Sequence, residues 1–202
     1  MPAPWHFESP QLLVRKLAVG GFENNVYVVA CAVTGEALVV DPGFDPDRVE
    51  AAVADVDPVA VVITHGHADH VGAARETAGR MQVPLLMHPA DVGIAGFEPD
   101  KPLTEGTLTA GRLEVEVRHT PGHTPGSTCL LVPGVVFTGD TLFPGGPGAT
   151  RFPYSSFETI VSSIAASLFT LDPATLVMPG HGLDTTIGVE APMLDAWKER
   201  GW

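Results

Sequence analysis

The chain has 202 residues, 45% of them apolar, and its 24 acidic side chains outnumber 11 basic ones to give a formal net charge of −13. This length predicts a single domain, residues 1–202, with one good core. An acidic surface of this kind does not favour nucleic-acid phosphates or anionic lipids, so neither nucleic acid nor membrane is an expected partner. Eight histidines stand beside three lysines, and neutral imidazole is the commonest metal ligand in proteins.

The N-terminal ten residues contain no basic segment and no apolar run of signal-peptide length. No apolar stretch approaches the roughly 20 residues that a membrane helix needs. Cys31 and Cys129 lie far apart without a CxxC partner, which favours buried thiols, with a disulfide between them as the alternative. These features predict a cytoplasmic location.

Short β-rich runs open the chain. Strands are predicted at 12–19, 26–33 and 37–40, the last ending in a turn at 41–43. Helical spacing follows over 47–56, and then the apolar run 59–63 is typical of a strand covered on both faces.

The second part of the chain continues this alternation. A helix is expected over 71–80, a strand over 83–87, and a strand with strictly alternating apolar residues over 112–118. Further strands are expected at 128–132, 135–138 and 176–178. The most regular helical pattern covers 157–171, and a closing helix covers 191–200. The order predicts an α/β protein with two β-rich halves and helices outside.

The strongest chemical signal is the run THGHADH at 64–70, directly after the buried strand and before a helix. His65 and His67, two apart in an extended turn, can point the same way, while Asp69 and His70 lie on the other side at the helix start. One loop of this kind can serve two metal ions. Asp69 is also well placed to cap the helix. The alternative, a solvated turn, gives no benefit from clustering histidines after an apolar strand.

Three further loops at strand ends each add one candidate ligand. They are PGH ending at His123, GD ending at Asp140 and PGH ending at His181. Each is weak alone, because a lone histidine or strand-end aspartate is usually structural. Together with the first loop they offer five histidines and two aspartates, enough for two metal ions with an open position on each.

The HxHxDH motif followed in order by these three loops resembles the metallo-β-lactamase fold superfamily, in particular its glyoxalase II-like (hydroxyacylglutathione hydrolase-like) branch. The resemblance runs over nearly the whole chain. It implies an αββα sandwich of two mixed β-sheets with helices on the outer faces.

Carried over by position, the resemblance implies seven metal ligands. These are His65, His67 and His123 for the first metal, Asp69, His70 and His181 for the second, and Asp140 as a bridge between the two. The two carboxylates of the set, Asp69 and Asp140, are the candidate catalytic residues. Asp41 matches a position that supports the site from outside the ligand shell, although a plain turn aspartate explains it equally well.

The implied activity is a binuclear, metal-dependent hydrolysis of a thioester or related small acyl ester by a metal-bound hydroxide. A thiolate with a pKa of roughly 8.5 departs without a dedicated general acid. Two divalent ions are the expected cofactors. Zinc is the first choice, and iron and manganese are the alternatives, since all three suit histidine and aspartate ligands.

The chain departs from glyoxalase II because it stops soon after the last of these loops, without the C-terminal helical extension that helps that enzyme bind glutathione. Substrate contacts are therefore expected from the loop over 143–154. In this loop, Arg151 beside Phe152 can bind a substrate carboxylate, with an ordinary surface arginine as the alternative. His119 either orients a ligand or has a structural role.

Other functions stay open. A persulfide dioxygenase resembles the same scaffold but uses one iron, held here by His65, His123 and Asp140. Lactone hydrolysis fits the full ligand set. β-Lactam hydrolysis is disfavoured, because Asp140 stands where one class of zinc β-lactamase has a cysteine. From a different class of function, a metal-stabilised binding protein without turnover is the remaining alternative.

Overall fold

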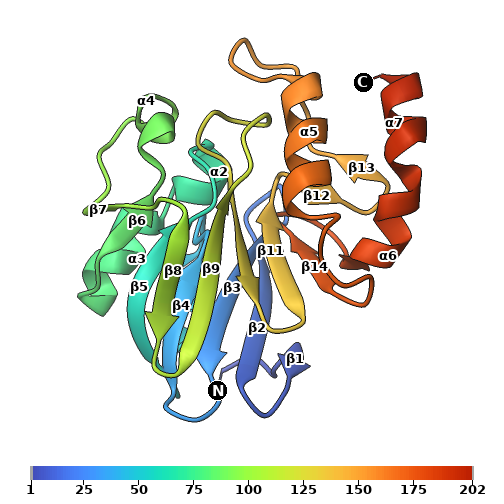
Figure 1. Cartoon of the computed structure of the whole chain (residues 1–202). Coiled ribbons are helices and arrows are strands. Elements are labelled where there is room, and N and C mark those ends of the chain that lie inside the picture. The colour runs from blue at the N-terminus through green and yellow to red at the C-terminus, as the bar shows by residue number, and fades with distance from the viewer. Residues whose placement is uncertain (1, 202) are drawn as a thin grey trace.

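The structure is a computed structural model that describes residues 2–201, and two β-sheets pack face to face in it with helices on their outer sides (Figure 1). The first sheet contains β1 to β7 in chain order. The second has the order β15-β14-β11-β10-β9-β8. The predicted αββα sandwich is confirmed.

The first sheet is antiparallel at its start and parallel at its end. Its strands are β1 (Phe7–Glu8), β2 (Leu12–Val19), β3 (Asn24–Cys31), β4 (Glu36–Val40), β5 (Asp57–Ile63), β6 (Leu85–Met87) and β7 (Lys101–Pro102). All eight residues of β3 are buried, because the second sheet covers one face of this strand and packed side chains cover the other.

The second sheet is antiparallel except where β11 runs parallel to β14. Its strands are β8 (Gly106–Ala110), β9 (Leu113–His119), β10 (Thr128–Val132), β11 (Val135–Gly139), β14 (Leu176–Pro179) and β15 (Thr185–Thr186). A separate small ribbon pairs β12 (Leu142–Phe143) with β13 (Gly146–Pro147).

Helices complete the two outer layers. On the side of the first sheet lie α1 (Pro46–Ala52), α2 (Ala68–Val71), α3 (Ala74–Met81), the 3₁₀ helix η1 (Pro89–Asp91) and α4 (Val92–Ala95). On the side of the second sheet lie α5 (Phe157–Ser167), α6 (Ile187–Glu190), the 3₁₀ helix η2 (Ala191–Met193) and α7 (Leu194–Arg200). Ser156 begins α5 by accepting a hydrogen bond on its Oγ from the Thr159 N–H at 3.2 Å.

Three apolar clusters hold the four layers together. The cluster between the sheets packs side chains such as Val29 and Leu38 with Val115 and Phe137. A second cluster lies between the first sheet and its helices, and a third joins the second sheet to α5 and α7 around the buried Trp197. The strict alternation in β9 follows from this arrangement, since only one of its faces meets the core.

Several expected boundaries are wrong in detail. The helix expected over 71–80 is two helices, so that the single turn α2 directs His70 inward while α3 packs on the sheet. Asp69 does not cap α2, whose N-cap residue is His67 without a side-chain cap bond. Strand β3 begins and ends two residues earlier than expected, and α1 and α5 end four residues earlier. The sequence analysis did not predict strand β8 or the short helix α6.

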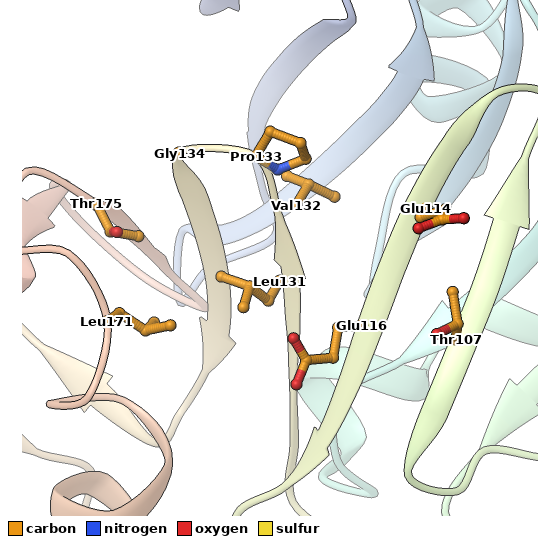
Figure 2. A pocket seen from close by; sticks show the side chains of 9 residues that line it. All are labelled: Thr107, Glu114, Glu116, Leu131, Val132, Pro133, Gly134, Leu171 and Thr175. Carbon is orange, nitrogen blue, oxygen red and sulfur yellow. The ribbon is translucent and has the colours of Figure 1, made fainter.

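Helices cover only part of the second sheet. A hollow of about 480 Å³ lies on its outer face. Figure 2 shows side chains that line it, among them Thr107 of β8, Glu114 and Glu116 of β9 and Leu131 of β10. None of its nine lining residues is a histidine, a cysteine or an aspartate. This large hollow therefore lacks the side chains that the predicted chemistry needs.

Two further findings bear on the sequence predictions. Cys31 and Cys129 are both buried and free, so the alternative of a disulfide between them is excluded. Within residues 2–201, no helix combines the length and apolar character that crossing a bilayer requires.

Candidate metal centre

The seven predicted ligands come from four loops at one edge of the sandwich, close to α2 in Figure 1. His65 and His67 follow β5, Asp69 and His70 lie in α2, and the other loops follow β9, β11 and β14. Because parallel neighbours end at the same edge of a sheet, β4 with β5 and β11 with β14 deliver their following residues to one place. The sheet topology therefore brings together candidate ligands that lie far apart in the sequence.

The first trio consists of His65, His67 and His123. The Nδ1 atom of His67 lies 3.1 Å from Nε2 of His65 and 2.9 Å from Nε2 of His123. His65 and His123 are buried, and His67 is half-buried. Three ring nitrogens thus face one point, with ligand atoms within 4.8 Å of one another.

The second trio consists of Asp69, His70 and His181. Nε2 of His181 lies 3.3 Å from Nε2 of His70 and 3.3 Å from Oδ2 of Asp69. His70 is fully buried, whereas the other two side chains keep about a quarter of their surface exposed, 25% for Asp69 and 24% for His181. This trio therefore combines two imidazoles with one carboxylate at the floor of an open hollow.

Asp140 lies between the two trios. Its Oδ1 is 3.4 Å from Nε2 of His70, and its Oδ2 is 3.5 Å from Nε2 of His123 and 3.7 Å from Nε2 of His181. Asp140 also shares a cluster of possible ligand atoms with His65 and His70. Its carboxylate thus lies within 3.7 Å of ring nitrogens from both halves of the centre.

The outer hydrogen bonds of the histidines decide which nitrogen faces inward. Nδ1 of His123 meets the carbonyl of Ala149 at 2.7 Å, and Nδ1 of His181 meets the carbonyl of Phe22 at 2.9 Å. A carbonyl can only accept, so both Nδ1 atoms carry the proton and both Nε2 atoms present lone pairs. Nδ1 of His70 likewise donates to Oδ2 of Asp41 at 2.9 Å.

Asp41 also fixes, through Thr64, which ring nitrogen of His65 carries the proton. Thr64 donates its hydroxyl proton to Oδ2 of Asp41 at 2.6 Å, so its Oγ1 accepts from Nδ1 of His65 at 3.2 Å. Oδ1 of Asp41 accepts from the backbone N–H of Thr64 at 2.7 Å. Asp41 is therefore no plain turn residue, since it sets the inward nitrogens of His65 and His70.

Two observations test whether this arrangement suits metal ions. In the first trio, the inward nitrogens of His65 and His123 lie 3.1 Å and 2.9 Å from Nδ1 of His67, so one cation between them would satisfy all three nitrogens. Oδ1 of Asp140 is also buried, and no hydrogen-bond donor within residues 2–201 reaches it. The donor set of imidazoles and carboxylates fits zinc, iron or manganese.

The electrostatics differ between the trios. Burial lowers the pKa of all three histidines of the first trio, assisted by neighbouring imidazoles, and brings that of His67 to about 4. Burial also lowers the pKa of His70, but the carboxylates of Asp140 and Asp41 outweigh it and raise the pKa overall. The first trio is therefore neutral near pH 7, which is the protonation state that binds a metal.

Asp91 is a residue that the sequence analysis missed. Its fully buried carboxylate accepts from the Gly66 N–H at 2.7 Å, the Thr124 hydroxyl at 2.6 Å and the Gly126 N–H at 2.6 Å. It thus ties the loop of His65 and His67 to the loop of His123. A Cβ atom at Gly66 or Gly126 would lie within 3.0 Å of Asp91 atoms, so glycine is required at both contacts.

Two further residues hold single ligands and were also missed. The buried side-chain amide of Asn24 donates to Oδ2 of Asp69 at 3.2 Å, and the Asn24 backbone forms a β-bridge with His181. Tyr154 places its hydroxyl 2.8 Å from Nε2 of His67, the nitrogen that points away from the centre. Asn24 therefore positions the second trio, and Tyr154 positions the first.

A hollow of about 430 Å³ opens over the centre. Five of the seven predicted ligands line it, namely His67, Asp69, His123, Asp140 and His181, and its other walls include Phe22, Arg151 and Phe152. The Phe152 ring lies 4.6 Å from the His67 ring and stacks on Tyr154 at 5.6 Å. The structure thus places both predicted substrate residues, Arg151 and Phe152, beside the centre.

His119 does not contact any of the predicted ligands through its ring. Its Nε2 donates to the Pro125 carbonyl at 2.8 Å, and its ring stacks on His88 at 4.3 Å. These contacts brace the turn that carries His123. The structural role, rather than direct orientation of a ligand, accounts for this residue.

A two-sheet sandwich with clustered histidines and aspartates at one edge is typical of a class of metal-dependent hydrolases. Comparison of the sequence with known families identifies the class. The sequence pattern of the metallo-beta-lactamase superfamily matches residues 19–181. The chain therefore belongs to this superfamily.

Sequence relatives agree with this assignment. An uncharacterized protein of Aquifex aeolicus is 36% identical over 198 residues, which cover 89% of this chain and 94% of the relative. The hydroxyacylglutathione hydrolase GloC of Haemophilus influenzae is 35% identical over 177 residues, which cover 76% of this chain and 84% of GloC.

Solved structures with the same fold include three that bear on function. The BLEG-1 B3 metallo-beta-lactamase superposes with a TM-score of 0.80 and 30% identity, covering 89% of this chain and 96% of that one. TTHA1623, crystallised in a di-iron-bound form, superposes with a TM-score of 0.79 and 32% identity, covering 88% of this chain and 97% of that one. ETHE1 from Myxococcus xanthus superposes with a TM-score of 0.76 and 30% identity, covering 88% of this chain and 80% of that one.

Proposed function

We propose that the chain hydrolyses small acyl thioesters or related esters at a centre of two divalent metal ions. The observation that carries this proposal is the convergence of five inward-facing imidazole nitrogens on two carboxylates. The similarity to a hydroxyacylglutathione hydrolase supports the substrate class, and the similarity to a di-iron protein supports two ions.

In this proposal the first trio, His65, His67 and His123, holds one ion and the second trio, Asp69, His70 and His181, holds the other. Asp140 lies between the trios and would offer its carboxylate to both ions. When bound, such ions supply Lewis acidity to a carbonyl group and an activated water at neutral pH. Zinc, iron and manganese all suit this donor set.

The chain's own residues contribute positioning and charge. The opposing imidazoles, His70 first, lower the pKa of the Asp140 carboxyl against the effect of its burial, and Asp140 is thus ionised near pH 7. Acceptors on the outer side of His70, His123 and His181 hold the Nδ1 protons of these rings, so that their Nε2 atoms face the centre. The Phe152 ring packs against the His67 ring at 4.6 Å and gives that side of the hollow an apolar wall. A thiolate leaving group, with a pKa of roughly 8.5, needs no side-chain acid.

The test is metal analysis of protein purified without added metal, followed by a panel of acyl thioesters, oxygen esters and lactones. Two divalent ions per chain with thioester hydrolysis are expected. Metal-loaded protein that cleaves no member of the panel would refute the proposal. Preferred cleavage of lactones would replace the thioester by a lactone as the substrate.

A persulfide dioxygenase is the second candidate, because ETHE1 shares the fold at 30% identity. His65, His123 and Asp140 would then hold one iron, and Nε2 of His123 does lie 3.5 Å from Oδ2 of Asp140. The convergence of Asp69, His70 and His181 favours the hydrolase, because a single iron at the other residues would leave this second trio without an ion to bind. One iron per chain and oxygen uptake on glutathione persulfide would reverse the preference.

A further inference from the structure

Two histidines outside the metal centre stack on each other across the two sheets. His88 directly follows β6 of the first sheet, and His119 ends β9 of the second. Their ring centroids lie 4.3 Å apart with planes inclined by 7°, and both residues are partly buried. Two charged imidazoles at this distance would repel each other, because partial burial reduces the screening by water. The geometry of the stacked pair therefore depends on its protonation state.

His88 holds the segment that carries Asp91. The hydrogen bonds of the Asp91 carboxylate to the two loops of the first trio form what we term the Asp91 link. Nδ1 of His88 accepts a hydrogen bond from the Ala90 N–H at 3.2 Å and so caps η1, while the His88 carbonyl accepts from the Asp91 N–H at 3.1 Å. A backbone N–H only donates, so Nδ1 must present a lone pair and the His88 ring must be neutral.

The surroundings of His88 favour this neutral state. Burial lowers the pKa of His88, and the neighbouring His119 imidazole assists it. Two carboxylates that face the pair, Asp91 in η1 and Glu105 in the segment before β8, oppose the shift without reversing it. Glu105 also accepts a hydrogen bond from the His119 N–H at 3.4 Å. The fold therefore keeps the ring in the form that the cap of η1 requires.

His119 holds the opposite side of the Asp91 link. Its Nε2 donates to the Pro125 carbonyl at 2.8 Å. Pro125 lies between Thr124 and Gly126, and each of these two donates a hydrogen bond of 2.6 Å to the Asp91 carboxylate. The stacked pair thus connects the segment that presents the carboxylate with the turn that binds it.

We propose that the stacked His88–His119 pair is a positioning element that holds the Asp91 link, and that protonation of His88 weakens metal binding by the first trio. The inference rests on the metal centre of the proposed function and concerns its regulation. Protonation removes the lone pair of Nδ1, so the Ala90 N–H loses its acceptor and the segment of Asp91 loses its cap. The contribution of the neutral ring is complete above a pH of about 6.5, the ordinary pKa of histidine, and is lost as the pH falls below it.

Titration of the full chain with Co²⁺ between pH 7.5 and pH 5.0 tests the inference, and the step that Asp91→Asn weakens reports on the first trio. His88→Ala removes the acceptor and should weaken this step about fivefold at pH 7.5, the effect of one net hydrogen bond. His88→Asn keeps an acceptor at the cap and does not titrate, so it should match wild-type protein at pH 7.5. On acidification to pH 5.0, wild-type protein should lose about fivefold more affinity than His88→Asn. Identical pH profiles of the two would overturn the inference.

A double variant determines whether His88 acts through Asp91. In an Asp91→Asn background, His88→Ala should change the affinity of the first trio by less than about twofold, because the link that it supports is already broken. The same fivefold loss in both backgrounds would mean that His88 acts independently of Asp91, and this result would overturn the inference. His119→Phe keeps a ring against His88 and removes the donor to Pro125, so it should weaken the same step. An unchanged step in His119→Phe would exclude His119 from the positioning element.

His6→Asn is the matched control. His6 is an exposed histidine whose Nε2 lies 2.6 Å from Oδ2 of Asp184, so its replacement removes one titrating imidazole at a different place. The first-trio step and its pH dependence should stay as in wild-type protein. A pH profile altered as in His88→Asn would show that any lost imidazole has this effect, which contradicts the inference.

A measurement without metal distinguishes failure of this inference from failure of the proposed function. If wild-type protein binds no Co²⁺, the proposed metal centre has failed, and magnetic resonance of the metal-free protein decides the inference. The amide signals of Gly66 and Gly126, whose N–H groups donate to Asp91, should follow the titration of the His88 ring and lose this dependence in His88→Asn. Amide signals that do not follow the His88 titration would reject the inference. Binding of Co²⁺ without hydrolysis of any ester would refute the proposed activity alone.

Discussion

The two halves of the candidate metal centre differ in their ligands and in the residues that hold them. The first trio is made of imidazoles alone, and Asp91 and Tyr154 hold it from outside. The second trio includes a carboxylate, and Asn24 holds it through Asp69. Asp140 and Asp41 reach both halves. The centre thus has separate outer supports and a shared middle, so substitutions should affect one half or both in a predictable way.

Asp140→Ala should have the largest effect, because it removes the carboxylate that lies between the trios. We expect metal content to fall in both halves and hydrolysis to drop by more than about 100-fold. Metal stoichiometry and turnover of the metal-loaded protein check this. Glu158→Ala, at an exposed carboxylate in the first turn of α5, is the control. Loss of stability in Asp140→Ala, with no turnover in the parent protein, would favour a metal-stabilised binding protein.

Asp91→Asn should weaken metal binding by the first trio about 10- to 100-fold and spare the second trio. The amide keeps the volume of the carboxylate but turns a donor toward groups that need an acceptor. Titration with Co²⁺, followed by absorption spectroscopy, resolves the two binding steps. Asp100→Asn removes a similar backbone contact at Leu85, away from the centre, and should leave both steps unchanged. Equal weakening of both steps by Asp91→Asn would show that the halves are not separately held.

Asn24→Ala should give the opposite pattern. Without the amide donor, Asp69 loses one contact that orients its Oδ2, and we expect binding by the second trio to weaken about tenfold while the Co²⁺ step that Asp91→Asn weakens stays the same. Thermal unfolding of the metal-free protein separates this effect from general destabilisation. Weakening of the same Co²⁺ step as in Asp91→Asn would contradict the assignment of Asn24 to the second trio.

Tyr154→Phe should have the smallest effect. The variant keeps the ring stacked on Phe152 and removes only the hydroxyl at Nε2 of His67. One net hydrogen bond corresponds to a change of about fivefold in the metal affinity of the first trio. The same titration measures it, with the second step as the internal control. An effect as large as that of Asp91→Asn would mean that Tyr154 is a main support of the first trio.

The sequence indicated the ligand residues well because their signal is local. HxHxDH sits in six consecutive positions after an apolar strand, and His123, Asp140 and His181 each stand in a glycine-containing turn next to a strand. The structure brings all seven together. Their supports gave no such signal, because Asp91 lies 25 residues from Gly66, Asn24 lies 45 from Asp69, and Tyr154 lies 87 from His67.

In the fold, too, some features follow from local sequence patterns and others depend on residues that are distant in the chain. Alternation in β9 and the apolar run of β5 predicted strands correctly, since burial of one or two faces determines those patterns. The division of the expected helix into α2 and α3 was not predictable, because it depends on where His70 must point in the assembled site. Ends of elements depend on neighbours that are distant in the chain.

Short spacings along the chain encode the identity and order of the candidate ligands and the strand-and-loop pattern that carries them, and these residue types define the chemistry that is available. Which ring nitrogens face the centre, which buried carboxylate joins which loops, and that Arg151 lies beside the centre follow only from tertiary contacts. These properties depend on distances through space between residues from separate layers, and packing of the two sheets sets those distances.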